Sequence, residues 1–177
     1  MKNTAHNLAR TIKSLKNRRI GVVGDLMLDR YVWGTATRLS PEAAVPIVDF
    51  VEETACLGGA GNVAANLAAL GARVSCFGVL GKDEYAAPLV TRLRALGTGV
   101  KGIVTDELRK TTVKTRIIAR HQQVVRVDRE TRAALSAEIQ EQLARRIISG
   151  LRGLDALVLS DYDKGVVFQE YALFPWR

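Results

Sequence analysis

The chain has 177 residues, of which 47% are hydrophobic and 25% are charged, as in an ordinary globular protein. This length suits one domain, with or without a small appendage, and the composition excludes a disordered chain, a coiled coil and a fibrous repeat. No segment approaches the ~18 unbroken apolar residues of a membrane helix. The first 15 residues are polar and basic, and the two cysteines form no CxxC motif. We therefore expect a cytoplasmic protein with no membrane contact.

The net charge of +8 is distributed unevenly. Residues 21–90 carry four basic and eight acidic side chains, whereas residues 91–126 carry nine basic and two acidic ones. A basic segment that binds nucleic acid usually interleaves its cations with aromatic rings, and residues 91–126 contain no Phe, Trp or Tyr. We therefore expect no nucleic acid among the partners.

Hydrophobic patterns and turn residues predict the secondary structure. In chain order we expect a helix over 8–15, strands over 19–23, 31–33 and 45–51, a helix over 62–70, a strand over 74–79, a helix over 83–96, strands over 100–104, 111–119 and 124–127, a helix over 136–151 and a strand over 155–159. Asp83 and Ser136 are the expected N-caps of their helices. Pro46 and the acids around it place strand 45–51 at the edge of a sheet.

Strands that alternate with helices predict an α/β fold, with a parallel sheet flanked by helices. Two groups of strands, in residues 31–51 and 111–127, break this alternation because no helix separates neighbouring strands. We expect these two groups to form a small separate β sheet that covers a site as a lid.

The glycines of Gly58-Gly59-Ala60-Gly61 precede the expected helix 62–70 and allow three interpretations. A P-loop is excluded, because the only Gly-Lys pair, Gly81-Lys82, is followed by Asp83 instead of Ser or Thr. A dinucleotide fingerprint, G-x-G-x-x-A, does occur from Gly59, but the strand before it is charged where a buried apolar strand is required. The third interpretation is that the glycines let a polyhydroxy ligand approach the backbone at a helix N-terminus.

Polar side chains near these glycines favour the third interpretation. Asn62 and Asn66 lie one helical turn apart and share a face. Their amides match adjacent sugar hydroxyls, although for either Asn alone hydrogen bonds to the local backbone are the favoured explanation.

Carboxylates and a lysine follow two of the expected strands. Asp25 and Asp29 follow the first strand, and Asp161 and Lys164 follow the last one. Ligands of parallel α/β sheets bind at the carboxyl ends of the strands, so we expect these groups to converge on one site.

Strand 111–119 is expected to place basic side chains on one face. Lys114 and Arg116, with Arg120 after them, alternate with uncharged residues. One interpretation is a solvated sheet face. The other is a surface that collects a phosphorylated small molecule, with Lys114, Arg116, Arg120 and Arg126 as its cations.

Several motifs together resemble one protein family. They are Gly24-Asp25-Leu26-Met27-Leu28-Asp29, Arg38-Leu39-Ser40-Pro41-Glu42-Ala43, the glycine motif continued through Asn66, Lys114-Thr115-Arg116, Arg126-Val127-Asp128 and Leu159-Ser160-Asp161-Tyr162. In this order and spacing they resemble the ribokinase-like carbohydrate kinases of the phosphofructokinase-B type. They are most similar to the branch that phosphorylates heptose 7-phosphate, which includes the kinase half of bifunctional ADP-heptose synthases. The resemblance covers roughly residues 15–167.

The resemblance implies a site and its partners. It implies that Asp29, Gly58, Gly59 and Asn62 line the sugar site and that Asp161 faces it. The implied substrate is a phosphorylated sugar, the implied cofactors are ATP and Mg²⁺, and the implied assembly is a homodimer formed through the lid. Residues 1–167 then form the N-terminal part of a carbohydrate kinase domain, and residues 168–177 a tail that does not match. Asp163 stands where the family has a glycine.

A second signature of the family does not occur in the 177 residues. It is of the D-T-x-G-A-G-D type and contains the catalytic base and the anion hole. We therefore expect the fold to be truncated before its C-terminal half, with the base beyond the C-terminus, and we name no catalytic residue and no metal ligand. The expected function is the sugar-holding half and lid of an ATP-dependent heptose 7-phosphate kinase, which serves ADP-heptose and lipopolysaccharide core synthesis. The alternative is a non-catalytic remnant that only folds or dimerises through the lid.

Overall fold

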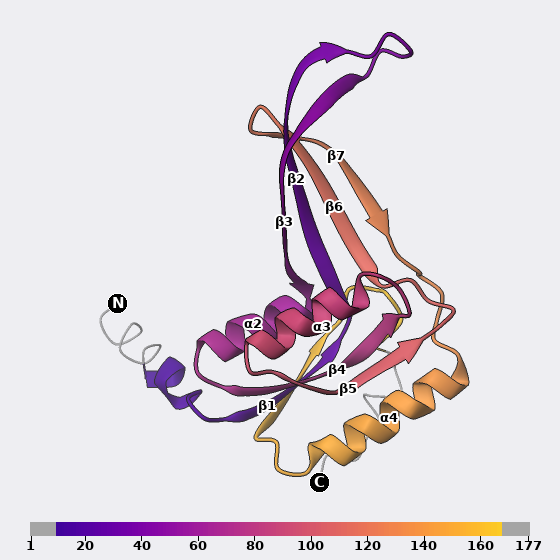
Figure 1. The fold of residues 1–177 in the computed structure, drawn as a ribbon. Helices are drawn as coiled ribbons and strands as arrows, with labels where there is room; N and C mark the ends of the chain where they lie inside the picture. The colour runs from indigo at the N-terminus through magenta and orange to yellow at the C-terminus, as the bar shows by residue number, and fades with distance from the viewer. Residues whose placement is uncertain (1–9, 168–177) are drawn as a thin grey trace.

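Two four-stranded sheets organise the computed structural model, which describes residues 10–167 (Figure 1). The elements are β1 (Arg19–Gly24), β2 (Leu26–Leu39), β3 (Pro46–Gly59), α2 (Ala60–Ala69), β4 (Arg73–Gly81), α3 (Ala86–Ala95), β5 (Gly99–Asp106), β6 (Thr112–Ala119), β7 (Gln122–Arg129), α4 (Ala137–Leu151) and β8 (Ala156–Ser160). Residues 10–14 are also helical. The start of the expected helix 8–15 and the tail 168–177 lie outside the described residues.

The first sheet has the order β5-β4-β1-β8, and all its neighbouring strands are parallel. Helices α2 and α3 cover one face and α4 covers the other (Figure 1). Successive residues of β1 face opposite layers: Val22 belongs to the core beneath α2 and α3, and Val23 to the core beneath α4. The predicted α/β fold with a helix-flanked parallel sheet is confirmed.

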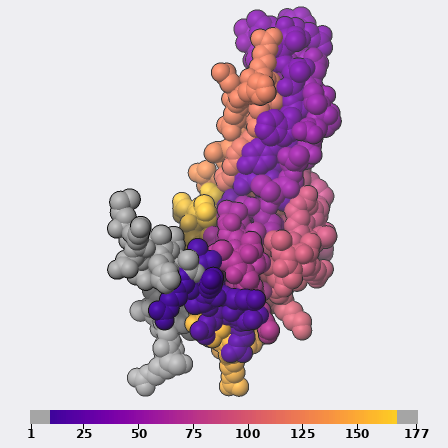
Figure 2. Space-filling model, turned by 90° about the vertical axis from the view of Figure 1, so that its left-hand side faces the viewer, coloured from indigo at the N-terminus to yellow at the C-terminus, as the bar shows by residue number. Residues whose placement is uncertain are grey.

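The second sheet has the order β3-β2-β6-β7 and stands away from the body (Figures 1 and 2). It unites the two groups of strands, 31–51 and 111–127, that were expected to form a separate sheet. Strand β3 lies at its edge and begins at Pro46, as expected for a proline that cannot donate to a neighbour.

The strands of this sheet are longer than predicted. β2 and β3 have 14 residues each, and their pairing runs from Leu26 opposite Gly59 to Leu39 opposite Pro46. The predicted strands 31–33 and 45–51 were too short because the backbone pairing continues through charged residues that show no hydrophobic alternation.

One expected cap is present and the other is not. The Ser136 hydroxyl accepts a hydrogen bond from the Ile139 N–H, at 3.4 Å, at the start of α4. Asp83 is not the N-cap of α3, which begins at Ala86. Its carboxylate accepts instead from the N–H of Tyr85 at 3.1 Å and of Thr111 at 2.8 Å, so it joins the approach to α3 to the start of β6.

A single residue, Asp25, separates β1 from β2 and joins three elements. Its N–H donates to the Ser160 carbonyl at 3.1 Å, and its own carbonyl accepts from the N–H of Ala60 at 3.0 Å. Gly24 has no side chain here because a Cβ would overlap the Ser160 carbonyl oxygen. The corner therefore brings the start of α2 and the end of β8 to the base of the second sheet.

Candidate functional site

The carboxylate of Asp25 is an internal anchor for the loop after β8. The residue is 1% exposed, and its oxygens accept from the N–H groups of Tyr162 at 2.7 Å, Lys164 at 3.3 Å and Val166 at 3.4 Å. Burial raises the pKa of Asp25, and these hydrogen bonds offset the rise only in part. Asp25 was expected to bind substrate, but in this structure its carboxylate faces the loop and positions it.

Arg109 binds backbone carbonyl groups of the same region. It is 7% exposed, and its guanidinium donates to the carbonyls of Thr131 at 2.9 Å, Lys164 at 2.9 Å and Ala133 at 2.6 Å. Burial lowers the pKa of Arg109, against the attraction of Asp106 and Asp25. Sequence analysis missed this residue because a single arginine in a basic segment shows no sign of burial.

Strand register places polar side chains in two rows across the second sheet. In the first row Asp29 pairs with Lys114, and Lys114 pairs with Asp128. In the second row Tyr31, Arg116 and Arg126 are paired in the same way. Lys114 and Arg116 therefore lie on one face, as the alternation of strand 111–119 predicted.

Asp29 and Arg116 form the central ion pair of this face. Arg116 Nη1 lies 2.6 Å from Asp29 Oδ1, and the guanidinium also lies 5.2 Å from the centre of the Tyr31 ring. The Asp29 carboxylate raises the pKa of Arg116. Asp29 was expected in a loop, but it lies within β2. Gly58 makes room for it, since a Cβ there would be 2.5 Å from Asp29 Oδ2.

Glu130 joins this face to the loop after β8. Its side chain is 8% exposed, and its carboxylate lies 3.6 Å from Lys114 Nζ, 3.3 Å from Lys164 Nζ and 2.6 Å from Arg132 Nε. Burial alone would raise the pKa of Glu130, but its bonds to Arg132 and Lys164 and the charge of Lys114 outweigh burial and lower it.

Asp128 and Glu130 were not among the expected site residues. The sequence did offer one indication of their role. Both acids follow closely on the basic segment 91–126, where they can neutralise neighbouring cations. Asp128 binds Lys114 at 3.1 Å and Arg126 at 2.8 Å. Three of the four cations expected to bind a phosphate, Lys114, Arg116 and Arg126, are therefore already paired with carboxylates.

The glycine motif joins the end of β3 to α2, with Gly58 beside Asp29 and the two asparagines on α2. Gly59 has φ +53°, and a Cβ there would overlap the Asp25 carbonyl oxygen, so this position requires glycine. Asn62 and Asn66 are exposed on α2 and share a long hydrogen bond of 3.4 Å. Both amides retain capacity to bind a ligand.

Asp161 is exposed in the loop after β8, and its Oδ1 accepts from the N–H of Asp163 at 2.9 Å. Asp163 has φ +58°, in the left-handed region that favours glycine. This conformation explains the glycine of the family at that position.

One expected site residue lies elsewhere. Arg120 is in the turn between β6 and β7, with φ +49°, and is not on the strand face. It lies four positions after Arg116, a distance of about 13 Å along an extended strand. The alternation could not show that the hairpin turns at this point.

The described residues present no pre-formed cluster of metal ligands. Within residues 10–167, no group of three or more His, Cys, Asp or Glu side chains is arranged to hold a metal ion. The described residues also lack the family's second glycine-rich signature, whose backbone donors would surround a phosphoryl group.

The chain belongs to the pfkB family of carbohydrate kinases, whose family model matches residues 17–172. The match ends five residues beyond position 167, inside the segment that was expected not to match. Among the residues that the structure covers, no helix is both long and apolar enough to cross a membrane.

The curated relatives include two proteins named bifunctional protein HldE. That of Pelobacter propionicus is 46% identical over 162 residues, which are 89% of this chain and 33% of that protein. That of Sulfurimonas denitrificans is 48% identical over 152 residues, which are 86% of this chain and 32% of that protein. The chain thus spans about a third of the length of the curated relatives it matches.

Solved structures share the fold at lower identity. The tetrameric inhibited form of phosphofructokinase-2 from Escherichia coli aligns with a TM-score of 0.61 and 20% identity, over 81% of this chain and 45% of that one. A ribokinase from Cryptococcus neoformans in complex with ADP aligns with a TM-score of 0.54 and 18% identity, over 81% and 40%. These likenesses establish a ribokinase-like fold.

Proposed function

We propose that this chain forms the sugar-binding half and lid of a kinase that phosphorylates heptose 7-phosphate. The observation that carries the proposal is the Asp29–Arg116 pair, which lies beside Gly58 where the second sheet meets the main sheet. The similarity to the HldE proteins and the resemblance of the motifs to the heptose 7-phosphate kinases support this choice of sugar.

At the proposed site, Asp29 and Asn62 bind the sugar hydroxyls, and Asp161 faces the bound sugar from the loop after β8. A carboxylate accepts bonds from hydroxyls, and an Asn amide both donates and accepts, so together they suit adjacent hydroxyls of one sugar. Gly58 and Gly59 let the ring approach the backbone.

The proposed phosphate site uses the cations of the second sheet together with Lys164. Arg116, Lys114 and Arg126 now contact carboxylates, and a phosphate with more negative charge competes for the same N–H groups. Lys164 reaches this face through Glu130. Binding of the phosphate therefore exchanges internal ion pairs for ion pairs with the substrate.

The proposed reaction transfers the γ-phosphoryl group of ATP to the anomeric hydroxyl of the sugar; Mg²⁺, when bound with ATP, would neutralise the charge of the phosphates. It would occur in the cytoplasm and serve ADP-heptose and lipopolysaccharide synthesis. Residues 10–167 hold and orient the sugar and shield it under the second sheet. We assign no base and no nucleotide contact to them.

We also propose that two copies pair through their second sheets. Several hydrophobic side chains are exposed on these strands, among them Phe50, Val51 and Val127. Phe50→Glu should then shift a dimer toward monomer in analytical ultracentrifugation, and an unchanged mass would contradict the pairing.

Calorimetric titration with heptose 7-phosphate tests the proposed site. Asp29→Ala and Asn62→Ala should each weaken binding by about 1–3 kcal/mol, because each leaves a sugar hydroxyl without its partner. Asp49→Ala is the matched control, since Asp49 is an exposed carboxylate of β3 whose ion pair in the described part of the chain is with Arg38, at 3.5 Å. Equal affinity in wild type and both site variants would refute the proposal.

A further inference from the structure

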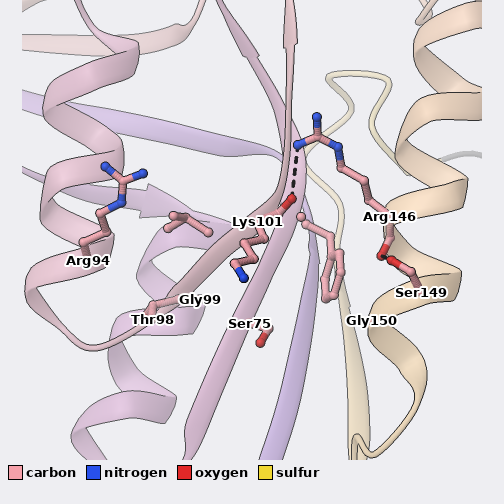
Figure 3. A pocket seen from close by; sticks show the side chains of 11 residues that line it. Ser75, Arg94, Thr98, Gly99, Lys101, Arg146, Ser149 and Gly150 are labelled. Carbon is pink, nitrogen blue, oxygen red and sulfur yellow. Dashed lines mark hydrogen bonds between the residues drawn. The ribbon is translucent and has the colours of Figure 1, made fainter.

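A cavity among the described residues lies at the opposite end of the strands from the proposed sugar site. It has a volume of about 600 Å³ and follows the first residues of β5, between α3 and α4. Figure 3 shows Arg94 of α3 on one side, Arg146 and Ser149 of α4 on the other, and Lys101 of β5 between them. Nothing in the proposed kinase function uses this hollow.

The charge of the cavity wall is entirely positive. Arg94, Lys101 and Arg146 line it, and none of the lining residues that the structure describes is acidic. Neither Arg94 nor Lys101 forms an ion pair within residues 10–167, whereas Lys114, Arg116 and Lys164 of the proposed sugar site are all paired. Unpaired cations around one hollow favour an anion.

A hydroxyl group in the same wall has no partner. Thr98 is 4% exposed, and its Oγ1 is buried without a hydrogen bond. Such an orphan costs free energy in the empty protein, and a ligand oxygen at this wall removes the cost. Ser75 and Ser149 add two further hydroxyls to the lining.

The remaining wall is largely apolar. Phe77 and Val100 line the cavity together with Gly99, Gly102 and Gly150. A Cβ at Gly150 would lie 2.5 Å from the Phe77 ring, so glycine at this position lets α4 pack directly against that ring and leaves apolar surface in the wall.

The free edge of β5 suggests a different occupant, an added peptide strand, and the structure argues against it. Arg146 Nη1 donates to the carbonyls of Lys101 and Ile103, which are the acceptors that an incoming strand requires. The edge is already occupied by a side chain of α4, so a small molecule fits the hollow better than a strand does.

We propose that this cavity binds a small organic phosphate with an apolar body. Arg94 and Lys101 bind the phosphate, with Thr98 donating a hydrogen bond, and the body lies against Phe77 and Val100. This site is separate in sequence and position from the residues proposed to hold the sugar.

Phenyl phosphate and inorganic phosphate are suitable probes, titrated into the ¹⁵N-labelled 177-residue chain and followed by amide NMR shifts. The amides of Gly99, Lys101, Gly102 and Gly150 should shift, and phenyl phosphate should bind about tenfold more tightly because its ring buries apolar surface. Amides of Gly58, Gly59 and Asn62 report separately on the proposed sugar site.

Arg94→Gln and Lys101→Gln should each weaken phenyl phosphate binding about tenfold, the effect of one lost charge-assisted hydrogen bond. Lys13→Gln is the control, because Lys13 is exposed, forms no ion pair in the described part of the chain and does not line the cavity. Shifts confined to other amides, unchanged affinity in both site variants, or an equal loss in the control would each overturn the proposal.

Discussion

The carboxylate of Asp25 accepts a hydrogen bond from the backbone N–H of Tyr162, 137 residues later in the chain, at 2.7 Å. This contact holds the loop after β8 against the corner between β1 and β2. The same loop carries Asp161 and Lys164, so the position of both side chains at the proposed sugar site depends on a buried acid that does not face the ligand.

Asp25→Ala should destabilise the protein by about 2–4 kcal/mol, because three N–H groups lose their acceptor. Asp25→Asn should cost less, about 1 kcal/mol, since its carbonyl oxygen retains one acceptor position and no charge is buried. Urea denaturation followed by circular dichroism measures both. An alanine variant as stable as wild type would show that water replaces the carboxylate without loss.

Glu130 should make stability depend on pH in the acidic range. Its pKa is lowered from the ordinary value of 4.5, so the folded protein releases this proton more readily than the unfolded chain. The contribution is complete above about pH 5 and is lost as the pH falls through the lowered pKa. Burial raises the pKa of Asp25, and that group changes stability in the opposite direction.

Glu130→Gln isolates this effect. The variant should be less stable than wild type by about 1–3 kcal/mol near neutral pH, and the difference should shrink below about pH 4.5. Thermal denaturation at several pH values measures the difference. A difference in stability between wild type and Glu130→Gln that stays constant down to pH 3 would mean that Glu130 contributes by its packing and not by its charge.

Arg126→Gln should weaken binding of heptose 7-phosphate about tenfold and leave binding of the unphosphorylated sugar nearly unchanged, because the cation is proposed to meet the phosphate. Arg116→Gln should show the same preference with some loss for both ligands, since it also removes the partner of Asp29. Arg38→Gln is the control, as Arg38 is an exposed arginine of β2 paired with Asp49. If Arg126→Gln weakened the binding of both sugars equally, these residues would have no specific role in binding the phosphate.

Asp163→Gly should raise stability by about 0.5–1 kcal/mol. The residue has φ +58°, where a side chain costs free energy that glycine does not incur, although glycine also loses more entropy on folding. The midpoint of urea denaturation measures the gain, and a large loss would mean that the Asp163 side chain has a role of its own.

The sequence by itself determined the layered α/β fold, the separate second sheet, the Ser136 cap and the shared face of Lys114 and Arg116. Each of these follows from contacts or periodicities within a few residues, such as the bond from Ile139 to Ser136. The sequence also indicated that Gly58 and Gly59 lie where the backbone needs glycine. In the structure, no Cβ fits at either position.

Only the tertiary structure decided which charges meet. Arg116 binds Asp29 across 87 residues of sequence, and Glu130 brings Lys114 of β6 together with Lys164 of the loop after β8. Segment 91–126 carries a large positive charge as a sequence. In the fold, acids of β2 and β7 neutralise several of its cations, while Arg94 and Lys101 form no ion pair within residues 10–167. The burial of Asp25 was also decided only by the fold, because its sequence context is that of a ligand-binding carboxylate. Local patterns record neither the partner of a charge nor its desolvation, because both depend on residues that only folding brings within a few ångströms.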